Sequence, residues 1–124
     1  MRAHTSSILS LDFHVPKRMI VTVSSDNTIR LWDSQSYDQA VEFSSPIDQP
    51  LSVAAHPILP IFSCGFESGT MRVFDIEKNC LSDEFTQFNK PLRKLKYSPG
   101  GDLLVAVCED GSVALHSVRR QHLP

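Results

Sequence analysis

The sequence contains one segment, Thr22-Val-Ser-Ser-Asp-Asn-Thr-Ile-Arg-Leu-Trp-Asp33, in which two strand-like runs flank a short polar turn. In its second half, Thr28-Ile-Arg-Leu-Trp32, apolar and polar side chains alternate, which is typical of a β-strand with two different faces. The turn contains Asp26-Asn27, and asparagine tolerates the positive φ that a tight hairpin requires. The segment therefore predicts an antiparallel β-hairpin.

The same pattern returns twice along the chain at a spacing of 42 residues. Trp32-Asp33 is followed by Phe74-Asp75 and then by His116-Ser117 at equivalent places, and no gap is needed to align the three copies. The period lies within the ~40–45 residues of a β-propeller blade. We therefore divide the chain, as one repeat region over residues 1–124, into units at about 1–36, 37–78 and 79–124.

Each unit contains several strand candidates and no helix of useful length. The second run of the first and third units, Ile20–Val23 and Leu103–Val107, is apolar on both faces, which suits a strand in the middle of a covered sheet. Weaker strand candidates, Ala40–Phe43 and Ser82–Phe85, follow the third run. The prediction is an all-β fold, an open and incomplete propeller arc of about three four-stranded antiparallel blades.

The Thr22–Asp33 segment resembles the signature stretch of the WD40 family. That resemblance implies a structural hydrogen-bonded set of a histidine before the first strand, a hydroxyl residue in the second, an aspartate in the turn and a tryptophan in the third. In the first unit these are His4, Ser24, Asp26 and Trp32. The later units depart from the pattern, because Pro46 and Phe88 replace His4, and Phe74 and His116 replace Trp32. We expect those units to rely on apolar packing.

The number of units predicts exposed sheet faces. Propellers usually have 4–8 blades, and this chain supplies about two and three quarters repeat units, each of which corresponds to one blade. We therefore expect it to be a fragment of a longer protein that needs further blades in cis or in trans. Alone, it is expected to be poorly soluble or oligomeric, because two apolar faces would be bare.

Composition disfavours two classes of partner. A net charge of -2 is not the basic footprint of a nucleic-acid-binding domain. No apolar run approaches the roughly 20 residues of a membrane-spanning helix, so no membrane partner is expected.

The three cysteines have no Cys-x-x-Cys spacing, which is typical of reduced thiols in a cytoplasmic protein.

Motifs for catalysis are missing from the sequence. It contains no His-Glu-x-x-His pair, no Gly-x-Ser-x-Gly elbow and no Gly-rich phosphate loop. His14 and His56 occupy equivalent places at the ends of first strands, which indicates a structural role in a turn. The sequence therefore predicts a protein that is not an enzyme, with no catalytic residue, cofactor or metal.

One charged cluster, Lys90-Pro-Leu-Arg-Lys-Leu-Lys96, remains to be assigned. Strand alternation places Lys94 and Lys96 on one side and Arg93 on the other. One interpretation is a solvated blade face. The other is a contact, formed by these three residues, with an acidic partner such as an acidic protein tail, tubulin or RNA phosphate.

The favoured function is a non-catalytic scaffold for protein–protein interactions. The run from His56 to Phe74 resembles blades of the large multi-propeller WD-repeat proteins of centriole walls and cilia. That resemblance implies a cytoplasmic location at centrosome, centriole or cilium, with centriolar proteins or tubulin as partners. The alternatives are a general cytoplasmic complex-assembly adaptor and an adaptor that binds RNA or RNP.

Overall fold

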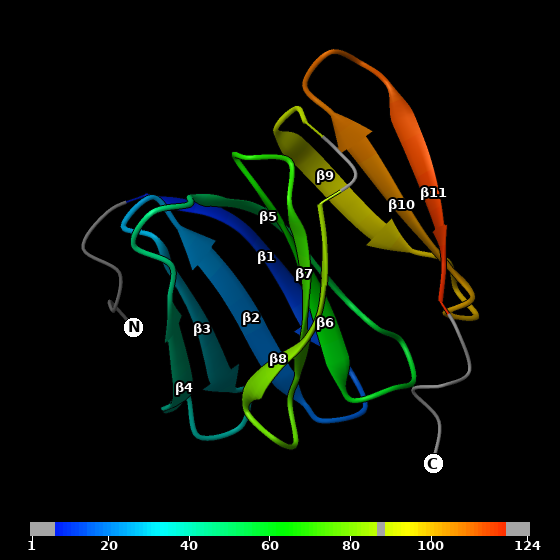
Figure 1. Cartoon of the computed structure of the whole chain (residues 1–124). Coiled ribbons are helices and arrows are strands. Elements are labelled where there is room, and N and C mark those ends of the chain that lie inside the picture. The colour runs from blue at the N-terminus through cyan, green and yellow to red at the C-terminus, as the bar shows by residue number, and fades with distance from the viewer. Residues whose placement is uncertain (1–6, 87–88, 119–124) are drawn as a thin grey trace.

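The computed structural model describes residues 7–86 and 89–118, which form three antiparallel sheets (Figure 1). The first sheet contains β1 (Ile8–His14), β2 (Met19–Ser24), β3 (Thr28–Asp33) and β4 (Gln39–Ser44). The second contains β5 (Pro50–Ala55), β6 (Ile61–Phe66), β7 (Met71–Asp75) and β8 (Cys80–Phe85). The third contains β9 (Leu92–Tyr97), β10 (Leu103–Cys108) and β11 (Val113–Ser117).

Each sheet is a meander in which strands that follow one another in sequence pair side by side. This confirms the prediction of an all-β, open arc of antiparallel blades. Within the described residues the third sheet has three strands rather than four. The unit boundary near residue 37 precedes β4, so the outermost strand of the first sheet belongs to the second sequence unit.

The three sheets stand side by side and meet through their first strands. Strand β5 contacts β1 on one side and β9 on the other. The last strands, β4, β8 and β11, lie away from this inner row (Figure 1). Adjacent sheets therefore have facing surfaces, whereas the outer face of the first sheet and that of the third have no neighbouring sheet among the described residues.

The hairpin turns between the second and third strands have the predicted backbone. Asn27, Gly69 and Gly111 occupy equivalent places and have φ values of 65°, 89° and 88°. Asparagine and glycine reach this left-handed region with little steric cost. The turn chemistry thus places β2 against β3, β6 against β7 and β10 against β11 in the same geometry.

Apolar side chains fill the space between the first and second sheets. Val21, Val23 and Leu31 from the first sheet pack on a cluster that includes Phe62 and Phe74 of the second. The rings of Phe62 and Phe74 stack with centroids 5.1 Å apart and an interplanar angle of 11°. Phe74, which replaces the tryptophan of the repeat, therefore contributes through apolar packing, as the sequence predicted.

The second and third sheets pack closely because Gly65 has no side chain. A Cβ at Gly65 would lie 2.7 Å from Leu92 Cβ and 2.6 Å from Ser52 Oγ. The Ser52 hydroxyl donates a hydrogen bond to Leu92 O at 2.9 Å across the interface. Around this contact, Ala54, Met71, Leu92, Leu95, Leu104 and Ala106 form a buried apolar cluster.

Candidate interaction surface

Three members of the predicted structural set lie on β2, β3 and the turn between them. The indole N–H of Trp32 donates to Thr22 Oγ1 at 3.0 Å, so the hydroxyl that accepts this bond belongs to Thr22. Thr22 and Ser24 are two positions apart and share a face of β2, and the sequence analysis named Ser24 for the hydroxyl member of the set. The structure places Thr22 diagonally across the strand pair from Trp32.

Ser24 and Asp26 bond within the adjoining turn. The Ser24 hydroxyl donates to Ser7 O at 3.0 Å and accepts from the Asp26 amide at 3.4 Å. Asp26 Oδ1 accepts from the amide of Thr28 at 3.1 Å and from its hydroxyl. His4, the fourth predicted member, lies outside the described residues. The contacts that are described stabilise the β2–β3 turn and join the end of β2 to the residue before β1.

Two buried histidines connect neighbouring sheets. His14 Nε2 bonds to Leu59 O at 2.7 Å in the β5–β6 loop, and its Nδ1 accepts from the Lys17 amide at 3.2 Å. Burial lowers the pKa of His14, although the bond to Leu59 opposes this effect. His56 repeats the arrangement one sheet further on, with Nε2 bonded to Gly101 O at 3.0 Å in the β9–β10 loop.

The basic run lies on β9 and divides into two parts. Arg93 pairs with Glu109 of the β10–β11 turn. Lys94 and Lys96 lie opposite Val107 and Val105 of β10. Neither lysine forms an ion pair with a carboxylate in the part of the chain that the structure describes.

Lys94 and Lys96 line a hollow of about 470 Å³ along the inner strands. Asp12 of β1 lines the same hollow, but its carboxylate accepts hydrogen bonds from the Ala55 amide at 2.8 Å and the Phe13 amide at 2.9 Å. The hollow is therefore lined by two lysines and one aspartate, a net positive charge, beside the apolar side chains of Val105 and Val107. This chemistry suits an acidic partner.

Both outer sheet faces expose large apolar side chains. On the first sheet, Leu11 and Phe13 are 57% and 54% exposed. On the third, Val113 and Leu115 are 62% and 67% exposed. Equivalent positions between the sheets, such as Ile29 and Leu31, are almost completely buried. Contiguous exposed apolar surface of this kind marks a site of protein association.

The described residues offer little chemistry of other kinds. Residues 7–86 and 89–118 contain no cluster of His, Cys, Asp and Glu that could hold a metal ion. Burial raises the pKa of the Cys64 thiol, and it raises the pKa of Tyr97 to about 12 although the Ser63 hydroxyl opposes it. Over those same ranges, no helix has the length and apolar character needed to span a membrane.

A protein-family model and several known proteins match this chain. The family model described as WD domain, G-beta repeat matches residues 1–33 and 79–117. WD repeat-containing protein 90 of Xenopus tropicalis is 42% identical over 99% of this chain, and its human counterpart is 37% identical over 94%. The chain spans 7% of the length of each of these two relatives.

Two further comparisons extend the likeness. Echinoderm microtubule-associated protein-like 4 of Xenopus laevis is 29% identical over 95% of this chain and 13% of that protein. The solved structure of U3-55K superposes with a TM-score of 0.87 at 19% identity, over 94% of this chain and 38% of that one. The likeness to the U3-55K structure supports the fold alone.

Proposed function

Because this chain belongs to the WD40 repeat family, we propose that it is a non-catalytic scaffold that holds other proteins together. The observation that supports the proposal is the pair of exposed apolar sheet faces described above. We infer that these faces take up further propeller blades, in cis or in trans, because a propeller is completed by 4–8 blades.

The proposed setting is the cytoplasm, at the centriole or cilium, as part of a larger WD-repeat protein. Support comes from the likeness to WD repeat-containing protein 90 and from the resemblance of residues 56–74 to centriolar WD-repeat blades. The name of a second relative includes the words microtubule-associated. Centriolar proteins and tubulin are therefore the partners that we propose.

The location of the endogenous protein tests this setting. With a tag at its own locus, we expect its signal to coincide with a centriole marker in fluorescence microscopy. Diffuse cytoplasmic or nuclear signal would contradict the centriolar proposal. In that case general cytoplasmic complex assembly becomes the better-supported function, and unbiased partner capture is the next measurement.

The lysine pair on β9 is proposed to contact the acidic partner. Replacing both Lys94 and Lys96 with glutamate should abolish binding to microtubules, because the acidic tails of tubulin would then face two like charges. Co-sedimentation with polymerised tubulin measures this. Binding of the unmodified chain should also weaken as salt is raised, since exposed charges are screened over about 8–10 Å at physiological ionic strength.

The matched control is the double substitution Lys17→Glu with Lys78→Glu, which changes the net charge equally. Both residues lie away from the hollow, and Lys17 pairs with Glu77. This variant should retain binding. Unchanged binding by the Lys94→Glu, Lys96→Glu variant, or equal loss in both variants, would reject the proposed contact.

A further inference from the structure

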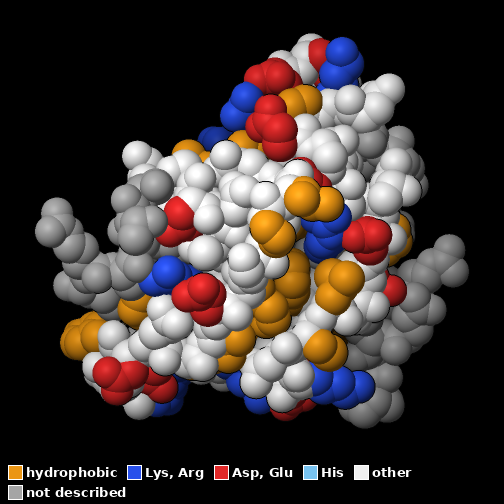
Figure 2. All heavy atoms as spheres, turned by 60° about the vertical axis from the view of Figure 1, so that its left-hand side comes forward, with side chains coloured by type: hydrophobic (Ala, Val, Ile, Leu, Met, Phe, Trp, Pro, Cys, Tyr) orange, Lys and Arg blue, Asp and Glu red, His pale blue; other side chains and the backbone are white. Residues whose placement is uncertain are grey.

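A second hollow opens between the outer parts of the first and second sheets. Its volume is about 340 Å³, within the range of sites that hold small ligands or single side chains. Ile29 and Phe43 line it from the first sheet, and Phe66, Phe74 and Leu81 line it from the second. In Figure 2, hydrophobic side chains form a band across the middle of the surface. We call this hollow the outer groove.

The outer groove follows from how the two sheets pack. Phe43 of β4 contacts Phe74 with ring centroids 4.8 Å apart and lies 6.2 Å from Phe62, so these rings close the inner part of the gap. Further out, Leu81 on β8 remains 47% exposed. Because both walls come from sheets already present, blades added to the outer faces of the first and third sheets would leave this groove open.

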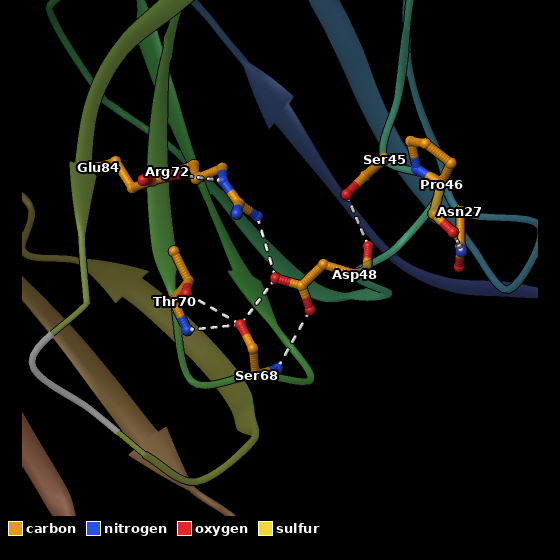
Figure 3. Close-up of polar contacts among 8 residues, drawn as sticks. All are labelled: Asn27, Ser45, Pro46, Asp48, Ser68, Thr70, Arg72 and Glu84. Atoms are coloured by element: carbon orange, nitrogen blue, oxygen red, sulfur yellow. Dashed lines mark hydrogen bonds and ion pairs between the residues drawn. The ribbon is translucent and has the colours of Figure 1, made fainter.

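Arg72 lines one end of the groove, and its guanidinium is paired with two carboxylates beside the groove. The Arg72 guanidinium lies over the Phe66 ring at 4.4 Å and contacts two carboxylates, Asp48 Oδ2 at 3.2 Å and Glu84 Oε1 at 2.6 Å (Figure 3). One cation therefore faces two anions, and the local charge is negative. Among the described residues, Glu84 Oε2 carries no hydrogen bond, and the side chain is 43% exposed.

Hydrogen bonds hold the other carboxylate in place. Asp48 accepts from the Ser68 hydroxyl at 2.7 Å and from the Ser68 amide at 3.2 Å (Figure 3). The loop that carries Asp48 is closed by the Ser45 hydroxyl, which donates to Asp48 O at 2.7 Å, and by Asn27 Nδ2, which donates to Pro46 O at 3.3 Å. Because the loop that carries Asp48 is already ordered, it loses little conformational entropy when a ligand binds.

We propose that the outer groove binds an extended peptide segment of another protein in which a large apolar side chain is followed by lysine or arginine. The apolar side chain occupies the space between Phe43 and Leu81. The cation pairs with Glu84, whose free oxygen is not needed by Arg72. This inference rests on the proposed scaffold function, but it uses a surface separate from Lys94, Lys96 and the outer sheet faces.

The test uses the exposed thiol of Cys80, which lines the groove, while Cys64 and Cys108 are buried. A trifluoromethyl group attached to Cys80 of the full chain reports on groove occupancy by ¹⁹F NMR. The probes are the peptides Ac-Ser-Gly-Leu-Arg-Gly-Ser-NH2 and Ac-Ser-Gly-Leu-Glu-Gly-Ser-NH2. We expect the arginine peptide to shift the resonance in a saturable manner and the glutamate peptide to bind about five- to tenfold more weakly.

Substitution of Glu84 tests whether its charge determines the preference between the two peptides. Glu84→Lys should reverse the preference between the two peptides, and Glu84→Gln should reduce it while keeping a neutral side chain beside Arg72. Glu109→Lys, which makes the same charge change on the third sheet, should leave the preference unaltered. Equal binding of both peptides, or the absence of a saturable shift in a folded chain, would overturn the proposal. Centriolar location and microtubule binding would be unaffected by that failure, so the two proposals fail separately.

Discussion

Replacing Phe62 with alanine is expected to lower the free energy of unfolding by about 3–5 kcal/mol. Phe62 is completely buried between the first and second sheets and stacks on Phe74. Alanine would remove the ring with its contacts and leave a cavity that the rigid strands on both sides cannot readily close. Urea denaturation of the 124-residue chain, followed by circular dichroism, measures the loss.

The control for this substitution is Phe13→Ala, which removes the same ring from the uncovered face of the first sheet. Phe13 is largely exposed, so little apolar surface returns to water and the change should be within about 1 kcal/mol. Similar losses for the two variants would show that the space between the sheets is not the main source of stability.

The second large effect is expected for Gly101→Ala, at about 2–4 kcal/mol of destabilisation. Gly101 has a φ of 80°, and a Cβ there would lie 2.3 Å from His56 Cε1 and 2.5 Å from Nε2. His56 is buried and cannot move aside without losing its bond to Gly101 O. The substitution should therefore weaken the connection between the second and third sheets as well as strain the turn.

The adjacent glycine provides a matched control. A Cβ at Gly100 would have an ordinary contact, 3.6 Å from Asp102 Oδ2, and its φ is not positive. Gly100→Ala should therefore change the free energy of unfolding by less than about 0.5 kcal/mol. Thermal or urea unfolding of the two variants side by side measures the contrast. Equal stability of Gly100→Ala and Gly101→Ala would contradict the close fit around His56.

Local patterns predicted the strands and turns because these depend on neighbouring residues. Alternation in Thr28–Trp32 corresponds to β3, and the turn residues Asn27, Gly69 and Gly111 have the positive φ that tight hairpins need. The spacing of 42 residues predicted the succession of similar sheets. These properties repeat with the sequence and require no knowledge of how one sheet meets the next.

The hydrogen-bond partners of side chains on different strands and sheets were harder to predict from the sequence. His14 and His56 were expected to have a structural role in turns, but the carbonyls of Leu59 and Gly101 that they contact lie 45 residues away. The hydroxyl bonded to Trp32 belongs to Thr22, a choice between two residues on one strand face that depends on the register of β2 with β3. Sequence spacing alone does not specify such contacts.

The sequence by itself determined the all-β architecture, the repeat and the position of the basic run, because alternation, turn residues and period are local or periodic properties. Only the tertiary structure decided that Lys94 and Lys96 face a hollow while Arg93 pairs with Glu109. It also decided that Phe43 and Leu81 form one groove. Such surfaces depend on the angle and distance at which separate sheets pack, which follow from the combined volumes of side chains distant in the sequence.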